Sequence, residues 1–555
     1  MSLLDVRAPG DNGDAGQAAA SLSPGRSRWA YASIMVVAAA VYLVNLDQAL
    51  DFDLDEVMYS LAGQNVAASG SVSWGAEPVS VHPPMHFLLV GLWTLVTGTA
   101  HGPIIDALYA ARLLGAVFSI LTVAMTGLLA RRFTTDSRLI AAAMGLVALD
   151  GFLVRFGRTA LIEPTAVLAG VVVVYLAVRL RTASEPRYVV VVGLASGVAL
   201  LVKEPLLFTV LVPVAAAVLE HDGRQVRRSA AAVLVGLLVW GVFPLWAVTG
   251  GAGAWWLSEH DISLRRISGL LQVSGLNRPG VSSTGVFGDT FVTYAGGYLI
   301  FALGAAGLLA LAYRGGLFHR RRLAAGPATL VAFGLLSYAF LAYCVVLGQA
   351  NEQLTAYSAV PAVLLTVLAW GSRPPKALVA AWLIAALVGV ATWTFTVALA
   401  RDDATARMGR YLTANAACAP VNATGNALRW APVLSRNHVE AYRDGDTAVA
   451  AGVRLFLLSP KDSRMRYGTS SPELDAFVRS HGAPVVAFAS RRYERIELWQ
   501  VSGPIRGEAA VTCGNSRPPV SSQASAPSFL MLFGAVLLLG ATASTGARAA
   551  RRRAS

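Results

Sequence analysis

The chain has 555 residues, of which 55% are hydrophobic and only 14% are charged, and its mean hydropathy is +0.56. Soluble globular proteins carry about 25% charged residues, so the composition excludes an ordinary soluble protein and indicates a membrane protein. The net charge of +13 does not indicate nucleic-acid binding, because the arginines form short clusters between apolar stretches and do not follow one face.

The first 28 residues are polar and rich in Gly, Ala and Asp, and we expect them to be disordered. The apolar stretch that follows lacks a small-residue cleavage site, which argues against a cleaved signal peptide. About twelve segments have the composition of membrane-spanning helices, which need about 20 apolar residues. These segments are 29–46, 107–130, 138–154, 160–178, 188–202, 204–219, 229–248, 295–313, 327–347, 354–370, 377–400 and 527–546.

Basic clusters between these segments predict the orientation of the chain. If every segment spans the membrane once, all the clusters fall on one side, which the positive-inside rule makes the cytoplasmic side. Both termini are then cytoplasmic. The clusters are Arg26 and Arg28, Arg131 and Arg132, Arg179 and Arg181, Arg224 with Arg227 and Arg228, Arg320 to Arg322, Arg373 with Lys376, and Arg551 to Arg553.

One further apolar stretch, "MHFLLVGLWTLVTG" at residues 85–98, is too short to cross a bilayer. Counting it as a span would also invert every later basic cluster. We therefore expect an amphipathic or re-entrant helix at the outer surface, inside one long outer loop at residues 47–106. A second outer loop is predicted at residues 249–294, and its two tryptophans at 255–256 suit a membrane interface.

Residues 401–525 have a different pattern, typical of a small α/β domain. The runs "VRLFLLS", "APVVAFAS" and "ERIELWQVS" predict strands, and "SPELDAFVRSHG" predicts a helix. The parity of the spans places this domain outside the membrane. The last span at 527–546 and a basic cytoplasmic tail at 547–555 follow it.

Cys418 and Cys513 stand near the two ends of this outer domain. An oxidising compartment would allow them to pair, and a disulfide closing so long a loop would stabilise the fold by about 4 to 5 kcal/mol. Two unrelated free thiols are the alternative. Cys344 lies inside a predicted span and is expected to be a small core residue.

Four carboxylates, Asp51, Asp53, Asp55 and Glu56, follow the first predicted span in "LDFDLDEVMY". Part of this pattern is structural: Asp53 can cap the helix that follows, with Glu56 at capping-box spacing and Asp55 at the positive end of the helix dipole. Four acids exceed the need of one cap, so a catalytic or ion-binding role stands beside this interpretation. Asp55 and Tyr59 share one helix face at i, i+4 spacing, and Glu56 points to a neighbouring face.

His82 stands in the same predicted outer loop, in "VHPPM". The two prolines stiffen the backbone and exclude a regular helix until the apolar run begins. The imidazole is therefore held at a junction between loop and helix. It fits either a substrate contact or a solvated loop side chain.

"LDFDLDEVMY" followed by "VHPPM" resembles the first outer loop of GT-C type membrane glycosyltransferases. The resemblance is greatest to bacterial polyprenyl-phosphate-sugar-dependent enzymes related to protein O-mannosyltransferases, of glycosyltransferase family 39, and to aminoarabinose transferases. Weaker similarity extends to Arg112 in "AARLLGAVFSIL", to "VRFGRTALIEPTAVL" and to "GVALLVKEPLLF". Together these motifs cover about the first 220 residues.

The resemblance implies transfer of a sugar from a polyprenyl phosphate to an acceptor hydroxyl at the outer surface. By analogy Asp55 is the general base, and Glu56 and Glu163 are further acids at catalytic positions. Cationic donors must meet the charge of the leaving phosphate. The expected substrate contacts are Asp53, Tyr59, His82, Arg112, Arg158, Lys203 and His260. Simple ion pairs, Arg158 with Glu163 and Lys203 with Glu204, fit the same sequence.

The sequence departs from the aminoarabinose transferases at Val81 and His82, where those enzymes carry an acidic and a basic residue before the prolines. This difference weakens the case for the metal site of that group. Asp53 and Asp55 still offer hard oxygen ligands, so a divalent cation at these two residues stays open. No other cofactor is expected.

The sequence thus predicts a polytopic α-helical membrane protein of GT-C-like fold, with about twelve spans and a small extracytoplasmic α/β domain, in a bacterial cell membrane. The expected function is inverting glycosyl transfer to a protein, glycan or lipid acceptor. A transporter is one alternative, although the sequence shows no internal repeat and the notable charges fall at outer span ends. A nonenzymatic cell-envelope assembly factor is the other.

Overall fold

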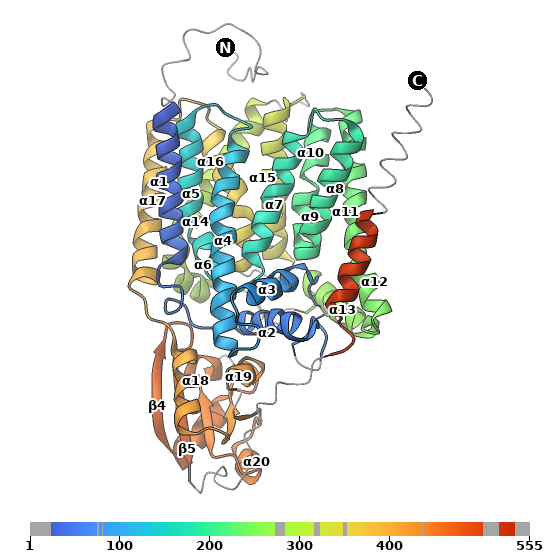
Figure 1. Cartoon of the computed structure of the whole chain (residues 1–555). Coiled ribbons are helices and arrows are strands. Elements are labelled where there is room, and N and C mark those ends of the chain that lie inside the picture. Colours follow the sequence, from blue (N-terminus) through green and yellow to red (C-terminus); the bar gives the residue numbers. More distant parts are fainter. Residues whose placement is uncertain are drawn as a thin grey trace.

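The computed structural model describes residues 24–74, 77–79, 81–271, 283–315, 322–347, 352–425, 427–434, 437–464, 466–502 and 521–538. Most of these residues form helices that run side by side as a bundle, and a small sheet domain lies beyond one end of it (Figure 1). We call this end of the bundle the sheet-domain end. The apolar side chains of the bundle form one continuous buried core.

The bundle helices follow the apolar segments of the sequence. Their bounds are α1 Pro24–Leu43, α4 Ile104–Ala130, α5 Ser137–Leu149, α6 Gly151–Gly157, α7 Glu163–Arg179, α8 Glu185–Val202, η1 Glu204–Leu206, α9 Leu207–Val210, α10 Val212–Leu219, α11 Gly223–Trp240, α12 Val242–Thr249, α14 Ser283–Arg314, α15 Ala325–Val346, α16 Glu352–Leu368, α17 Lys376–Trp393, η3 Thr394–Ala398 and a last helix Ala526–Leu538.

Each predicted span coincides with helix over its described residues, which for the last span end at Leu538, and the chain is a multi-pass membrane protein. Within the described ranges, six helices are long and apolar enough to cross a membrane, or seven if the bent pair α5 and α6 counts as one span. The remaining predicted spans correspond to helices that are shorter or less apolar, such as Glu352–Leu368 and Ala526–Leu538. The total of about twelve spans therefore stays a prediction from the sequence.

One predicted span is interrupted in the structure. The segment 138–154 bends by 55° between α5 and α6, because the carboxylate of Asp150 accepts a hydrogen bond from the backbone N–H of Phe152 and so caps a new helix. Lys203 stands between the predicted spans 188–202 and 204–219, where α8 ends before η1 and the backbone is extended (φ −162°, ψ 125°). The bend and this connection each carry a buried charged side chain, Asp150 and Lys203.

Three helices lie across the sheet-domain end of the bundle: α2 (Leu54–Ser69), α3 (Met85–Val96) and α13 (Gly253–Ile267) (Figure 1). The prediction that residues 85–98 form a short helix that does not span the membrane agrees with α3. Gly63 lets α2 and α3 pack closely, since a Cβ added there would stand 2.3 Å from a methyl carbon of Val90.

The sheet domain holds five strands in the order β2-β1-β3-β5-β4. β1 is parallel to β2 and β3, and β5 is antiparallel to β3 and β4. The predicted strands correspond to β3, β4 and β5 and the predicted helix to α22. β1 (PVNA) and β2 (HVE) were missed because, unlike β3 (LFLL), they carry no apolar run. The bounds are α18 Ala404–Asn415, β1 Pro420–Ala423, α19 Ala427–Val433, β2 His438–Glu440, α20 Gly445–Ala450, β3 Leu455–Leu458, α21 Pro460–Arg464, α22 Pro472–His481, β4 Gly482–Ser490 and β5 Glu494–Val501.

The chain returns from the sheet domain to the loop after α2. The N–H of Val72 donates to the carbonyl of Ala524 (2.7 Å), and Ser71 and Ser525 form an isolated antiparallel bridge. Cys418 is disulfide-bonded. Cys513 lies outside the described residues, so its pairing with Cys418 stays a prediction.

Candidate active site

The N-terminus of α2 positions the acidic motif. Asp53 adopts an extended backbone (φ −82°, ψ 155°), and its Oδ1 accepts a hydrogen bond from the N–H of Asp55 (3.3 Å). The carboxylate of Glu56 reaches back to the N–H of Asp53 (3.1 Å), which completes the predicted capping box. The cap fixes the rotation of α2, so Asp55 and Tyr59 face one side and Glu56 another.

Asp55 and Tyr59 face a cavity of about 2,540 Å³ at the sheet-domain end of the bundle. Six of the ten predicted catalytic and substrate-binding residues line it: Asp53, Asp55, Tyr59, His82, Lys203 and His260. These residues come from α2, the loop before α3, the break after α8, and α13. Glu204 also lines it, as do side chains that the sequence did not single out, among them Arg266, Arg429, Arg492 and Tyr493.

The side chain of Asp55 is half-buried, and its pKa is higher than the ordinary value of an aspartate. Burial, the neighbouring carboxylate of Asp53 and that of Glu163 raise its pKa from 3.8 to about 7, against the opposing effect of Lys203 and Arg492. A carboxyl with a pKa near neutrality exchanges protons readily at physiological pH, which suits a general base.

His82 stands over the ring of Tyr59, with ring centroids 5.7 Å apart. Burial, followed by the charge of Lys203, lowers the pKa of His82 well below its ordinary value. The imidazole is therefore neutral near pH 7. His82 can donate or accept a hydrogen bond in the cavity, but it does not supply the positive charge that the sequence interpretation gave it.

Lys203 forms a buried ion pair with Glu163 across the bundle, with Nζ 2.5 Å from Oε1. The hydroxyl of Tyr357, on α16, donates to the same carboxylate oxygen (3.1 Å), and the ammonium lies 5.7 Å from the centroid of its ring. The pairings Lys203 with Glu204 and Arg158 with Glu163, which the sequence also allowed, do not form. Glu163 thus holds the ammonium group that the connection between α8 and η1 presents to the cavity.

Tyr357→Phe should lower the free energy of unfolding by about 1.5 to 3 kcal/mol, the usual value of a hydrogen bond to a charged group. The hydroxyl is one of two partners of a carboxylate that is only 1% exposed. Thermal unfolding of the detergent-solubilised protein measures the change. Tyr313→Phe is the control, because that side chain is 70% exposed. Equal melting temperatures for the two variants would contradict this account.

His260, on α13, is held against the cavity wall by its neighbours. Its ring stacks on Trp256 (centroids 4.1 Å apart), its Nδ1 lies 2.8 Å from the carbonyl of Trp256, and its Nε2 lies 3.6 Å from the carboxylate of Glu204. Burial opposes the charged form, but Glu204 and the carbonyl outweigh it and raise the pKa of His260. His260 can therefore add positive charge beside Lys203.

Glu56, Arg112 and Arg158 do not line the cavity. Arg112 binds Glu56 through two hydrogen bonds, Nε to Oε1 and Nη2 to Oε2, both 2.9 Å, and also donates to the carbonyl of Leu50 (2.9 Å). The guanidinium of Arg158 donates to four backbone carbonyls at the end of α1, including that of Tyr42 (2.8 Å). Their contacts hold the chain between α1 and α2 in place.

The turn between β4 and β5 supplies a contact that sequence reasoning missed. Arg492 forms an ion pair with Asp53, and the hydroxyl of Tyr493 donates to the carbonyl of Phe52 (2.7 Å). These partners lie more than 400 positions apart in the sequence. The only signal was the pair of arginines in "SRRYER", between two predicted strands.

At the predicted cation site, both carboxylate oxygens of Asp53 already have partners within the protein. One oxygen of Asp53 accepts the N–H of Asp55 and the other binds Arg492. In the described part of the chain, no group of three or more His, Cys, Asp or Glu side chains could hold a metal ion. A divalent cation at Asp53 and Asp55 stays a prediction from the sequence.

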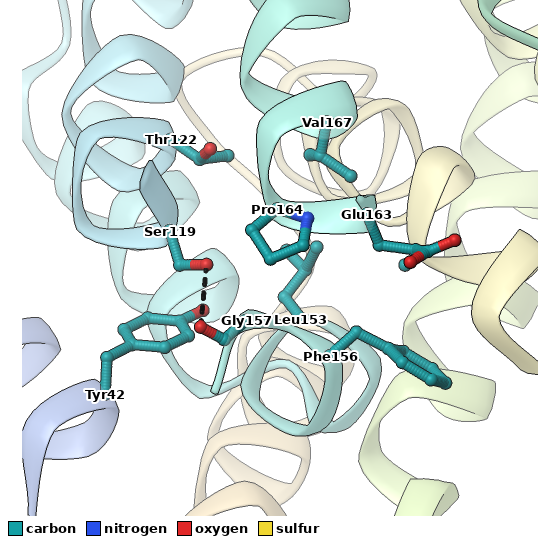
Figure 2. Close-up of a pocket in the computed structure, with 10 residues that line it drawn as sticks. Tyr42, Ser119, Thr122, Leu153, Phe156, Gly157, Glu163, Pro164 and Val167 are labelled. Carbon is teal, nitrogen blue, oxygen red and sulfur yellow. Dashed lines mark hydrogen bonds between the residues drawn. The ribbon is translucent and has the colours of Figure 1, made fainter. Parts of the chain in front are cut away.

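A second, smaller hollow lies inside the bundle between Tyr42, Ser119 and Pro164 (Figure 2). The side chain of Glu163 also borders it, and the hydroxyl of Ser119 donates to the carbonyl of Gly157 there (Figure 2). Its volume of about 10 Å³ is close to that of one water-sized probe. This hollow is too small for a sugar, so the large cavity is the candidate active site.

Known proteins resemble both the sequence and the fold. Residues 92–246 match the family model of dolichyl-phosphate-mannose-protein mannosyltransferases, and a comparison with curated protein sequences finds no match. The crystal structure of ArnT from Cupriavidus metallidurans bound to undecaprenyl phosphate is similar with a TM-score of 0.55 and 14% identity, over 87% of this chain and 100% of that chain. The oligosaccharyltransferase AglB from Archaeoglobus fulgidus, in complex with an inhibitory peptide and a dolichol-phosphate, has a TM-score of 0.54 and 12% identity, over 88% and 75%.

The fold is that of the GT-C class of membrane glycosyltransferases, and residues 92–246 also match a glycosyltransferase family model. Within the class, the segment from α3 to α12 is similar to the protein mannosyltransferases. The resemblance predicted from "LDFDLDEVMY" and "VHPPM" is therefore confirmed at the level of class and fold.

Proposed function

We propose that this protein transfers a sugar from a polyprenyl phosphate to an acceptor hydroxyl in the large cavity, by a single inverting displacement. One observation carries the proposal: the cavity joins a carboxyl of pKa about 7, Asp55, with cationic side chains from separate elements, including Lys203 and Arg266. A base for the acceptor and positive charge for a leaving phosphate are the two groups that the reaction needs.

The shape of the cavity supports a lipid-linked donor. Beside its polar part, the cavity is lined by apolar side chains of the bundle, among them Leu211, Leu336 and Phe340. Phe208 stacks on Phe340 there, with centroids 4.8 Å apart. An amphipathic donor could place its prenyl chain against these rings and its phosphate toward Lys203 and His260. ArnT and AglB, which share the fold, are described with undecaprenyl phosphate and dolichol-phosphate bound.

In the proposed reaction the acceptor oxygen attacks the anomeric carbon of the donor sugar. The bond from this carbon to the phosphate oxygen breaks, and the phosphate leaves with the electron pair. The acceptor proton passes to Asp55. Lys203, oriented by Glu163, and His260, whose pKa is raised, stabilise the negative charge of the phosphate, and neutral His82 is placed to hydrogen-bond a substrate oxygen.

The reaction is proposed for the outer face of a bacterial plasma membrane. The basic clusters assign the sheet-domain end to the outside and both termini to the cytoplasm. This arrangement is tested by cysteine labelling of intact cells. A membrane-impermeant reagent should label Ser480→Cys, an exposed position on α22. It should not label Arg131→Cys, an exposed position at the other end of α4. Labelling of Arg131→Cys alone would reverse the proposed orientation.

The direct test of the reaction uses purified protein in detergent with a panel of radiolabelled polyprenyl-phosphate sugars and a membrane extract as acceptor source. Transfer of label, or release of free polyprenyl phosphate, is the expected result. Heat-treated protein is the control. Neither transfer nor donor cleavage with any donor of a broad panel would overturn the proposed function.

The rate of transfer should rise with pH through about 7. Only the ionised form of Asp55 accepts a proton, and its pKa is raised to about 7. Below that pH the ionised fraction, and with it kcat/KM, should therefore fall about tenfold per pH unit. Ionisation of His82 does not change the rate near pH 7, because burial lowers its pKa well below the ordinary value. A rate that is constant between about pH 5 and 8 would exclude Asp55 as the base.

A further inference from the structure

The turn of the sheet domain at residues 490–494 reaches the first turn of α2. Arg492 pairs with the carboxylate of Asp53, and its Nε donates to the hydroxyl of Tyr493 (3.0 Å). That hydroxyl in turn donates to the carbonyl of Phe52 (2.7 Å). Arg492 and Tyr493 of the sheet domain thus bind Asp53 and Phe52, the two residues that precede α2.

Asp53 connects this turn to the proposed base. Its Oδ2 binds Arg492, and its Oδ1 accepts the backbone N–H of Asp55 (3.3 Å). The carboxylate of Asp53 therefore holds the backbone of Asp55 with one oxygen and the guanidinium of Arg492 with the other. All three side chains line the cavity.

We propose that Arg492 is a positioning residue for Asp55, through which the docked sheet domain holds the base in place and keeps it ionisable. The inference deepens the proposed function, on which the role of Asp55 as a base rests. It assigns the sheet domain a part in the reaction.

The charges around Asp55 explain why one arginine has this effect. Asp53, on the same helix, and Glu163, on α7, oppose the ionised form, whereas Lys203 and Arg492 favour it. Tyr59 and His82 also face this part of the cavity, and both are uncharged near pH 7, since the pKa of Tyr59 is raised and that of His82 is lowered. Lys203 is already paired with Glu163. Arg492 is therefore the positive charge that counteracts the effect of the Asp53 carboxylate on the pKa of Asp55.

Other contacts hold the sheet domain in place, so the role of Arg492 is separable from docking. The neighbouring Arg491 donates through Nη1 to the carbonyl of Phe395 (2.9 Å) and through its backbone N–H to Asp402 (3.0 Å). Asp51 accepts the N–H of Thr405 at the start of α18 (3.0 Å). Replacement of the Arg492 side chain leaves all these contacts.

The test is a direct titration of Asp55 in the full-length protein in lipid nanodiscs. Infrared difference spectra identify its carboxylic-acid band as the one that Asp55→Asn removes. Arg492→Gln should move the midpoint of this band upward by about one pH unit or more, the usual effect of removing a close opposite charge. The rate of transfer at pH 6 should then fall about tenfold.

Asp53→Asn should shift the same midpoint downward, because it removes the like charge, and Asn still caps the helix. Arg492→Lys should restore the wild-type midpoint, since the charge is kept. Arg495→Gln is the matched control: this arginine of the same hairpin pairs with Glu497, does not line the cavity, and should change neither the midpoint nor the rate.

The titration separates this inference from the proposed function. An unchanged midpoint in Arg492→Gln, or shifts of the same sign in Arg492→Gln and Asp53→Asn, would overturn the role of Arg492. Because the band is measured without substrate, it gives this answer even if no donor is cleaved. Absence of transfer with shifted midpoints would overturn the proposed function alone.

Discussion

Asp55→Asn is expected to lower the rate of sugar transfer at least 100-fold, while the protein remains folded and membrane-inserted. Loss of a general base costs about 10²- to 10⁴-fold. The amide has nearly the same shape as the carboxylate but cannot accept the acceptor's proton. Because Asp55 makes none of the capping contacts with its side chain, the helix should form unchanged.

The measurement is transfer from a labelled polyprenyl-phosphate sugar by membranes that hold equal amounts of each variant. Asp47→Asn is the matched control, because Asp47 is an exposed acid of the same loop and lies outside the cavity. The control should keep full activity. An Asp55→Asn protein with more than half of the wild-type rate would refute the proposed base.

The same pair of variants separates the two alternatives that the sequence left open. An assembly factor should be indifferent to Asp55→Asn, because its role would depend on binding surfaces of the sheet domain. A transporter should show a defect in substrate uptake and no covalent transfer of label. Only a glycosyltransferase loses formation of a labelled product.

Local sequence patterns predicted the parts of the site that depend on neighbours in the chain. The spacing of Asp53 and Glu56 gave the capping box, and the spacing of Asp55 and Tyr59 gave their common face. The apolar segments gave the bundle, because a bilayer requires helices of a certain length and composition. Short-range rules of this kind need no knowledge of the fold.

The roles of buried charges could not be predicted in the same way. Arg112 and Lys203 both stand near helix ends, and either could have faced the cavity. The fold decides between them: Arg112 is fully enclosed with Glu56, whereas Lys203 reaches the cavity from a break between helices. Arg492 was missed because it meets Asp53 only when the sheet domain docks. Such long-range contacts leave no periodicity in the sequence.

The second large expected effect is a loss of stability when the buried ion pair between Glu56 and Arg112 is broken. Glu56→Gln should lower the free energy of unfolding by about 3 to 5 kcal/mol, because it leaves an enclosed guanidinium without a counter-charge. Both side chains are at most 1% exposed, and the carboxylate also accepts the N–H of Ala160 (2.8 Å). Thermal unfolding in detergent should therefore show a much lower melting temperature.

An exposed ion pair gives the control for this effect. Glu473→Gln breaks the pair with Arg466, whose side chains are 66% and 64% exposed, and it should cost less than about 1 kcal/mol. Replacing both Glu56 and Arg112 by methionine should recover only part of the stability, because the carbonyl of Leu50 then loses its donor. If Glu56→Gln unfolded at the same temperature as Glu473→Gln, the buried pair would not stabilise the start of α2. A direct part for Glu56 in catalysis would then be the better explanation of its position in the motif.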